Sequence, residues 1–78
     1  MVWLVSMKLR QIVARNLRVL RKQRGLSQEE LAFQAGINRN YVGQIDREEK
    51  SPTVDIFEKL AKALEIKPED FFGQKPKR

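Results

Sequence analysis

The sequence predicts an all-α fold, a compact bundle of five short helices. Apolar residues recur at spacings of three and four, as on one face of an α-helix, and no stretch alternates as a strand does. Residues typical of helix starts and helix ends separate these apolar stretches. The chain has 78 residues, so we expect one domain that buries only about 60% of its unfolded surface. This length excludes a multi-domain enzyme with an internal cleft.

The first helix is expected over residues 8–24. Its inward stripe comprises Leu9, Ile12, Val13, Leu17 and Leu20. Basic side chains fall on the opposite side, and Gly25 ends the helix. Asn16 lies within the apolar stripe, where it could be a buried amide, a register device at an interface or a residue at the surface edge. We expect the surface edge.

The second helix begins at a capping box. The Ser27 hydroxyl can accept from the Glu30 amide, and the Glu30 side chain can reach back to the Ser27 amide. Leu31, Ala32 and Ala35 point inward over eight or nine residues. Gly36 ends the helix, because glycine adopts the left-handed conformation of a sharp turn at little cost.

The third helix is expected from an N-cap at Asn38 to about Arg47. Val42 and Ile45 form its inward pair, and the rest of the helix is polar. The residues predicted to lie on its outward face are Arg39, Asn40, Gly43 and Gln44.

Two further helices complete the bundle. Thr53 caps a fourth helix after the break at Ser51 and Pro52. Its apolar stripe comprises Val54, Phe57, Leu60, Ala61 and Leu64. A short fifth helix starts at Pro68, and Phe71 with Phe72 is expected to close the core.

The composition excludes several classes of site. The chain has no Cys and no His, so zinc fingers, disulfide frameworks, thiol nucleophiles and Ser-His-Asp triads are impossible. The paired acidic residues resemble helix-end or loop charges, and no cavity is expected to raise their pKa; the pairs are Glu29/Glu30, Glu48/Glu49 and Glu69/Asp70. We therefore expect no enzyme, no cofactor and no metal. The apolar run at the N-terminus is too short for a membrane span or a signal peptide, which favours a cytoplasmic protein without a membrane partner.

The charge is polarised along the chain. Lysine and arginine total 16 against 10 acidic residues, a net charge of +6. Residues 1–24 contain seven basic residues and no acid, whereas residues 49–73 contain four basic and six acidic residues. Such a stretch concentrates positive potential on one surface and favours a polyanionic partner, although a merely solvated helix face remains the alternative.

Two short helices joined by a tight glycine turn form an arrangement in which one helix braces and the other enters a groove. A major groove about 12 Å wide admits one helix whose inner face is apolar and whose outer face carries hydrogen-bonding side chains. The stretch GLSQEELAFQAGINRNYVGQIDR resembles the helix-turn-helix of XRE-type, phage-repressor-like transcription regulators, with restriction-modification controller proteins as its most similar small members. The resemblance spans roughly residues 12–72.

The resemblance implies a role for each matching position. Base edges would be read by Arg39, Asn40, Gln44 and Gly43. This agrees with general chemistry, because Arg binds guanine O6 and N7 while Asn or Gln binds adenine N6 and N7. The DNA backbone would be contacted by Gln28, Asn38, Tyr41, Arg47, Lys50 and Ser51. Two alternatives stay open: Tyr41 packing on the first helix, and Gly43 serving helix packing instead of close approach to DNA.

Arg21 and Asp46 occupy positions where the family often pairs an arginine with an acid beneath the reading helix, although glutamate is more usual there. The chain departs from the family after that helix, where a glycine turn is replaced by Arg47-Glu48-Glu49-Lys50. Two carboxylates would repel phosphates, so they point to solvent or the loop is set back from the DNA.

The resemblance implies one DNA-binding domain over residues 8–73. We expect residues 1–7 to be a flexible N-terminal extension and residues 74–78 to be a basic, disordered tail. Trp3 with its apolar neighbours could instead pack on a partner subunit.

The function expected is a sequence-specific transcription regulator that binds double-stranded DNA as a homodimer on a two-fold symmetric operator. Candidate dimer residues are Ile56, Ile66, Phe71 and Phe72. Controllers of restriction-modification systems, phage-type repressors and antitoxins of toxin-antitoxin pairs share this pattern. An RNA-binding or protein-interaction module is the alternative from another class.

Overall fold

The structure, a computed structural model, describes residues 2–73, with side chains from residue 9 onward. These residues form no strand, and their helices are α1 (Val2–Gln23), α2 (Gln28–Ala35), α3 (Arg39–Asp46), α4 (Val54–Leu64) and the 3-10 helix η1 (Pro68–Phe72). The prediction of an all-α fold is confirmed, and its fifth helix is the 3-10 turn. Within the described part of the chain, no helix is both long and apolar enough to cross a membrane.

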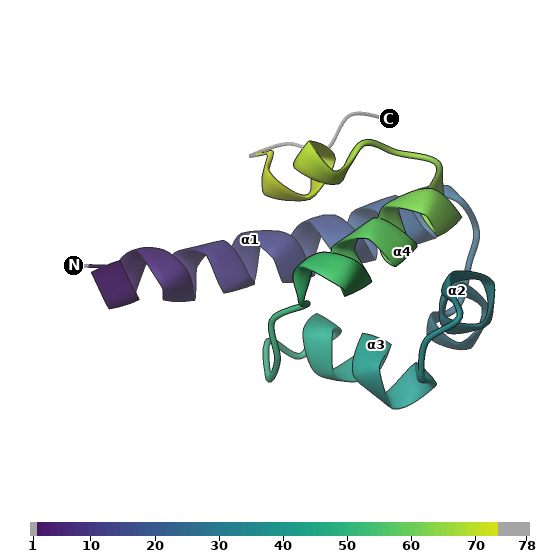
Figure 1. The fold of residues 1–78 in the computed structure, drawn as a ribbon, viewed down its shortest axis with the longest axis horizontal. Coiled ribbons are helices and arrows are strands. Elements are labelled where there is room, and N and C mark those ends of the chain that lie inside the picture. Colours follow the sequence, from purple (N-terminus) through teal and green to yellow (C-terminus); the bar gives the residue numbers. More distant parts are fainter. Residues whose placement is uncertain (1, 74–78) are drawn as a thin grey trace.

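The long helix α1 is the scaffold of the bundle. It contacts α3 and η1, while α2 contacts both α3 and α4. Figure 1 shows α2 nearly end-on beside the C-terminal end of α1, with α3 running across the view and η1 on the other side. α1 begins at Val2, so the helix takes in residues 2–7, where we expected an extension. The expected tail at residues 74–78 and the side chain of Trp3 lie outside the described residues.

The turn between α2 and α3 is built as the sequence predicts. The Ser27 hydroxyl accepts from the Glu30 amide at 3.0 Å, and the Glu30 carboxylate accepts from the Ser27 amide at 2.8 Å. Those two bonds, the backbone one first, hold the pKa of Glu30 below its ordinary value. Gly36 adopts φ 71°, and its amide donates to the carbonyls of Ala32 and Phe33. This left-handed residue lets α3 leave at a steep angle to α2.

The core lies between α1, the helix pair α2–α3 and the C-terminal half of α4. Its buried apolar residues are Val13, Ala14, Leu17, Leu20, Leu31, Ala32, Ala35, Val42, Ile45, Leu60, Ala61, Leu64 and Phe71.

Asn16 also belongs to this core, so the prediction that it lies at the surface edge is wrong. Its Nδ2 donates to the carbonyls of Phe71 and Gly73, both at 2.7 Å. The amide thereby ties η1 to α1 through its Nδ2, whereas its Oδ1 is buried and has no hydrogen-bond partner within the described residues.

Three apolar residues predicted to point inward are exposed: Leu9, Val54 and Phe72. Val54 is the first residue of α4 and Phe72 the last of η1. Helical periodicity gives the face on which a residue lies, but it does not tell how far the neighbouring element extends along that face. Phe72 still packs against the half-buried Phe57, and the centroids of the two rings lie 5.3 Å apart.

Candidate nucleic-acid interface

α3 is anchored by its apolar face and by its N-cap. Val42 and Ile45 are buried against the core, as the sequence predicts. The Asn38 side-chain oxygen accepts from the Asn40 amide at 2.7 Å, which satisfies one of the free donors at the helix start. Asn38 is an exposed residue, and its side-chain NH₂ group lies at the same end of α3 as Arg39.

The opposite face of α3 is open. The Arg39 side chain is 65% exposed, Asn40 is exposed and Gln44 is partly exposed. None of these side chains is buried in the monomer, so their donors and acceptors can reach a partner. Arg39 has one contact of its own, an ion pair between its Nη1 and Glu29 Oε1 of α2 at 3.5 Å.

The prediction that Gly43 is open on the outer face is wrong, because two polar side chains cover it. The residue is buried, and a Cβ added there would lie 3.1 Å from Arg47 Nη1 and 3.6 Å from Gln28 Oε1. The absence of a side chain therefore lets the Arg47 and Gln28 side chains lie across α3. Of the two explanations for a helical glycine, close packing is the one that matches these contacts.

A polar cluster holds α3 against α1 and α2. Arg21 Nη2 lies 3.3 Å from Asp46 Oδ2, with the two side chains 10% and 7% exposed. The same Asp46 oxygen accepts from Gln28 Nε2 at 2.7 Å, and Arg21 Nη1 donates to the Leu26 carbonyl at 2.9 Å. The predicted pair of Arg21 and Asp46 is thus present despite the shorter acid, and Gln28 completes it.

The loop after α3 carries the departure from the glycine turn. Glu48 adopts φ 63°, the left-handed conformation that a glycine would take more easily. Arg47 Nε donates to Glu49 Oε2 at 2.9 Å, and Arg47 Nη2 donates to Glu49 Oε1 at 3.3 Å. The hydrogen bond and then the charge of Glu49 raise the pKa of Arg47, and the same bond lowers the pKa of Glu49. Glu49 therefore faces Arg47.

The end of this loop returns to α1. Lys50 Nζ lies 5.5 Å from the centre of the Tyr41 ring, a cation–π contact between the loop and α3. The Tyr41 ring is half-buried and packs on the core. Ser51 Oγ accepts from Arg10 Nε at 3.0 Å, so the basic face of α1 reaches the loop.

Two residues of this surface were not singled out from the sequence. Glu29 was interpreted as a helix-end charge, yet it contacts Arg39. Arg10 was one of several arginines on α1, and only the tertiary fold brings it to Ser51, 41 residues away. The sequence did contain one signal for Glu29. The capping box already uses Glu30, so the neighbouring Glu29 has no capping role.

Comparison with known proteins decides the family. The helix-turn-helix family matches residues 17–71, which contain α2, α3 and the glycine turn between them. The chain belongs to the XRE-type helix-turn-helix family. It is a DNA-binding transcription regulator, as the resemblance implied.

Relatives of this regulator include controller proteins. Control protein C.SmaI from Serratia marcescens is 41% identical over 58 residues, covering 74% of this chain and 69% of that protein. The crystal structure of the restriction-modification controller protein C.AhdI from Aeromonas hydrophila matches with a TM-score of 0.76 and 43% identity, over 78% of this chain and 92% of that one. The controller protein C.Esp1396I, described as a tetramer with its natural 35 base-pair operator, matches with a TM-score of 0.75 and 30% identity, over 82% and 84%.

Proposed function

We propose that this regulator binds a two-fold symmetric operator as a homodimer and reads the major groove of each half-site with α3. The observation that carries the proposal is the two-sided character of α3. Its apolar side chains are buried in the monomer, whereas Arg39, Asn40 and Gln44 keep their polar ends accessible. A single helix reads too few base pairs to find one site in a genome, so a second copy is needed.

Each side chain has a role in the proposed complex. Arg39 would donate to O6 and N7 of a guanine, and Asn40 and Gln44 would each pair with N6 and N7 of an adenine. Residues at the ends and flanks of α3 would bind phosphate oxygens and so fix its register. The proposed backbone contacts are Gln28, Asn38, Tyr41, Arg47, Lys50 and Ser51. Residues 8–73 would form the binding domain.

Gln28 is suited to a double task. One hydrogen of its Nε2 group is used by Asp46, and the second can be donated to a phosphate. Asp46 belongs to α3 and is hydrogen-bonded to Gln28. A phosphate bound by Gln28 would therefore have a fixed position relative to the reading helix. Arg47 lies beside Gln28 over Gly43, and both Arg47 and Lys50 are exposed and supply positive charge.

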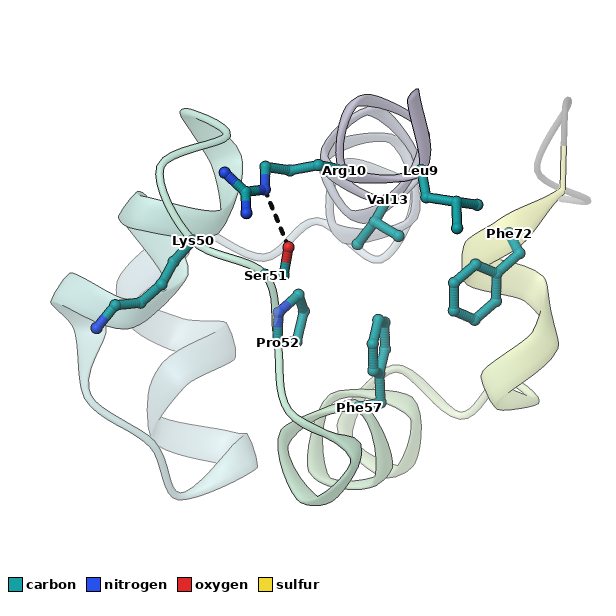
Figure 2. A pocket seen from close by; sticks show the side chains of 8 residues that line it. All are labelled: Leu9, Arg10, Val13, Lys50, Ser51, Pro52, Phe57 and Phe72. Carbon is teal, nitrogen blue, oxygen red and sulfur yellow. Dashed lines mark hydrogen bonds between the residues drawn. The ribbon is translucent and has the colours of Figure 1, made fainter. Parts of the chain in front are cut away.

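The second copy is proposed to dock on a pocket next to the α3–α4 loop. Figure 2 shows Leu9, Val13, Phe57 and Phe72 pointing into a shared space, which Pro52 closes from the loop. The pocket holds about 210 Å³, and Phe72 is 45% exposed at its rim. Because Lys50 and Ser51 also line this pocket, a partner seated there would lie beside the proposed DNA surface. C.Esp1396I is described as a tetramer on its operator, which supports self-association of this fold.

This surface differs from the residues expected to form the dimer contact. Phe71 is fully buried and is not accessible to a partner, so its selection was wrong. Phe72 was among the predicted residues and keeps its role in the proposal. Leu9, which was predicted to belong to the core, joins it.

We further propose that the regulator acts in the cytoplasm and catalyses no reaction. Its membership of a family of transcription regulators supports both proposals.

Replacing Phe72 with glutamate is expected to dissociate the dimer. Placing a carboxylate where a phenyl ring packed removes the apolar contact, worth about 1.5–3 kcal/mol, and raises the dimer dissociation constant by about 10- to 150-fold. Sedimentation equilibrium at micromolar protein should give the dimer mass for the wild type and a mass shifted toward the monomer for the variant.

Phe33 provides the matched control, because it is 86% exposed on α2 and does not line the pocket. Phe33→Glu should keep the dimer mass. A Phe72→Glu protein that remains as dimeric as the wild type, or equal dissociation of both variants, would rule out the pocket as the docking surface.

A further inference from the structure

Both arginines of the proposed DNA surface are held by carboxylates of their own chain. Arg39 Nη1 lies 3.5 Å from Glu29 Oε1, and Arg47 uses both Nε and Nη2 on the two oxygens of Glu49. All four side chains are at least half exposed. Exposed ion pairs contribute only about 0–1 kcal/mol to stability, so stability alone gives little reason for two of them on one small surface.

These carboxylates occupy donors that DNA would need. The guanidinium fork that binds two carboxylate oxygens is the same fork that binds a phosphate or the O6 and N7 of guanine. Arg47 is engaged in this two-bond manner by Glu49, and the pKa directions of both groups agree with a formed pair. Arg47 therefore has to exchange Glu49 for DNA at this edge of its guanidinium, and Arg39 has to exchange Glu29 wherever DNA binds through its Nη1.

We infer that Glu29 and Glu49 are intramolecular competitors of DNA for Arg39 and Arg47, and that Glu29 thereby limits the affinity for the operator. The inference rests on the proposed function. On a duplex without the matching guanine, Arg39 keeps Glu29 and adds nothing to affinity. On the operator, the bidentate contact with guanine replaces the carboxylate. Without Glu29, operator binding no longer has to break this ion pair and becomes tighter by its free energy, whereas a duplex without the guanine gains at most a weaker contact between Arg39 and a phosphate.

The two acids should differ in their effect because their arginines differ in role. Arg47 is a phosphate contact, and phosphates are present in every duplex. Removing Glu49 should therefore strengthen binding to all sequences alike and leave the discrimination unchanged. Removing Glu29 should strengthen operator binding more than non-specific binding and so raise the ratio between them.

The chain offers a matched control for the loss of one negative charge. Glu48 is adjacent to Glu49 in the same loop, and among the described residues it takes part in no ion pair. Glu48→Gln therefore reports the general gain in affinity from a more positive surface. Any gain in DNA affinity beyond that of Glu48→Gln is attributed to the arginine that has lost its carboxylate partner.

The experiment measures the affinity of full-length wild type and of Glu29→Gln, Glu49→Gln and Glu48→Gln. Each protein is titrated with a duplex selected from a random pool and with a scrambled duplex of equal length. Relative to Glu48→Gln, we expect Glu49→Gln to bind both duplexes about two- to five-fold more tightly. Glu29→Gln should bind the selected duplex more tightly by a similar factor, and the scrambled duplex by a smaller factor. Thermal unfolding checks that the variants are folded.

Double variants test whether the gain passes through the arginine. In an Arg39→Gln background, Glu29→Gln should increase the affinity for DNA by no more than Glu48→Gln does. In an Arg47→Gln background, Glu49→Gln should likewise give no increase beyond that of Glu48→Gln. Equal behaviour of all three acid variants would overturn the inference while leaving the proposed function intact. A wild type that binds both duplexes equally would instead overturn the proposed function.

Discussion

Replacing Asp46 with alanine is expected to lower the free energy of unfolding by about 3–5 kcal/mol. The change removes the carboxylate that Arg21 Nη2 and Gln28 Nε2 share, in a site where both charged side chains are at most 10% exposed. The Arg21 guanidinium is then left almost buried without a counter-charge. For a small domain with a total stability of about 5–15 kcal/mol, such a loss is a large fraction of the whole.

Urea unfolding of Asp46→Ala and Asp46→Asn measures this effect. The asparagine keeps the shape and one acceptor oxygen, so Asp46→Asn should lose less stability than Asp46→Ala. A loss below about 1 kcal/mol for the alanine variant would show that the cluster is as weak as an exposed ion pair.

The cluster is better explained by positioning than by net stability. Arg21 Nε and Asp46 Oδ1 are buried, and within the described residues neither has a hydrogen-bond partner. A partly satisfied buried ion pair is weakly stabilising at best compared with an apolar contact of similar size. What the pair does provide is a fixed orientation of α3 relative to α1, and through Gln28 relative to α2.

Replacing Arg39 with alanine is expected to weaken operator binding by about 1–3 kcal/mol, a factor of roughly 5 to 150. Arg39 stands at the first position of α3 with a side chain that is 65% exposed, so its loss leaves the fold intact. The lost contact is a base contact, and therefore discrimination at one base pair of each half-site should relax while the other positions keep theirs.

A panel of duplexes, each with one substituted base pair in the selected site, measures this change. The wild type should lose affinity at the guanine that Arg39 reads, whereas the Arg39→Ala protein should bind all four base pairs there equally. If the variant loses affinity equally for every duplex, Arg39 is a backbone contact and its assignment to a base is wrong.

The elements of the fold could be predicted because their boundaries are local. Ser27, Asn38 and Thr53 are N-caps in the structure, and Gly36 has the left-handed conformation that ends α2. Each of these signals depends on a few neighbouring residues. By contrast, the exposure of Val54 and the burial of Asn16 depend on how the elements pack, and the two carbonyls that bind Asn16 lie 55 and 57 residues away along the chain.

The candidate site was predictable to the same extent. The pairing of Arg21 with Asp46 and the open position of Arg39 agree with the sequence interpretation. The burial of Gly43 could not be foreseen, because it comes from the Gln28 and Arg47 side chains that cross α3. The partner of Arg39 was missed for a similar reason, since Glu29 reaches it only after the glycine turn has brought α2 and α3 together.

The central claim is that the open face of α3 reads base edges in two neighbouring half-sites. Selection of bound duplexes from a randomised pool by the wild-type protein tests it most directly. We expect a two-fold symmetric consensus whose half-sites lie about one helical turn apart, with a guanine and adenines at the read positions. Recovery of duplexes with no common motif would contradict the claim.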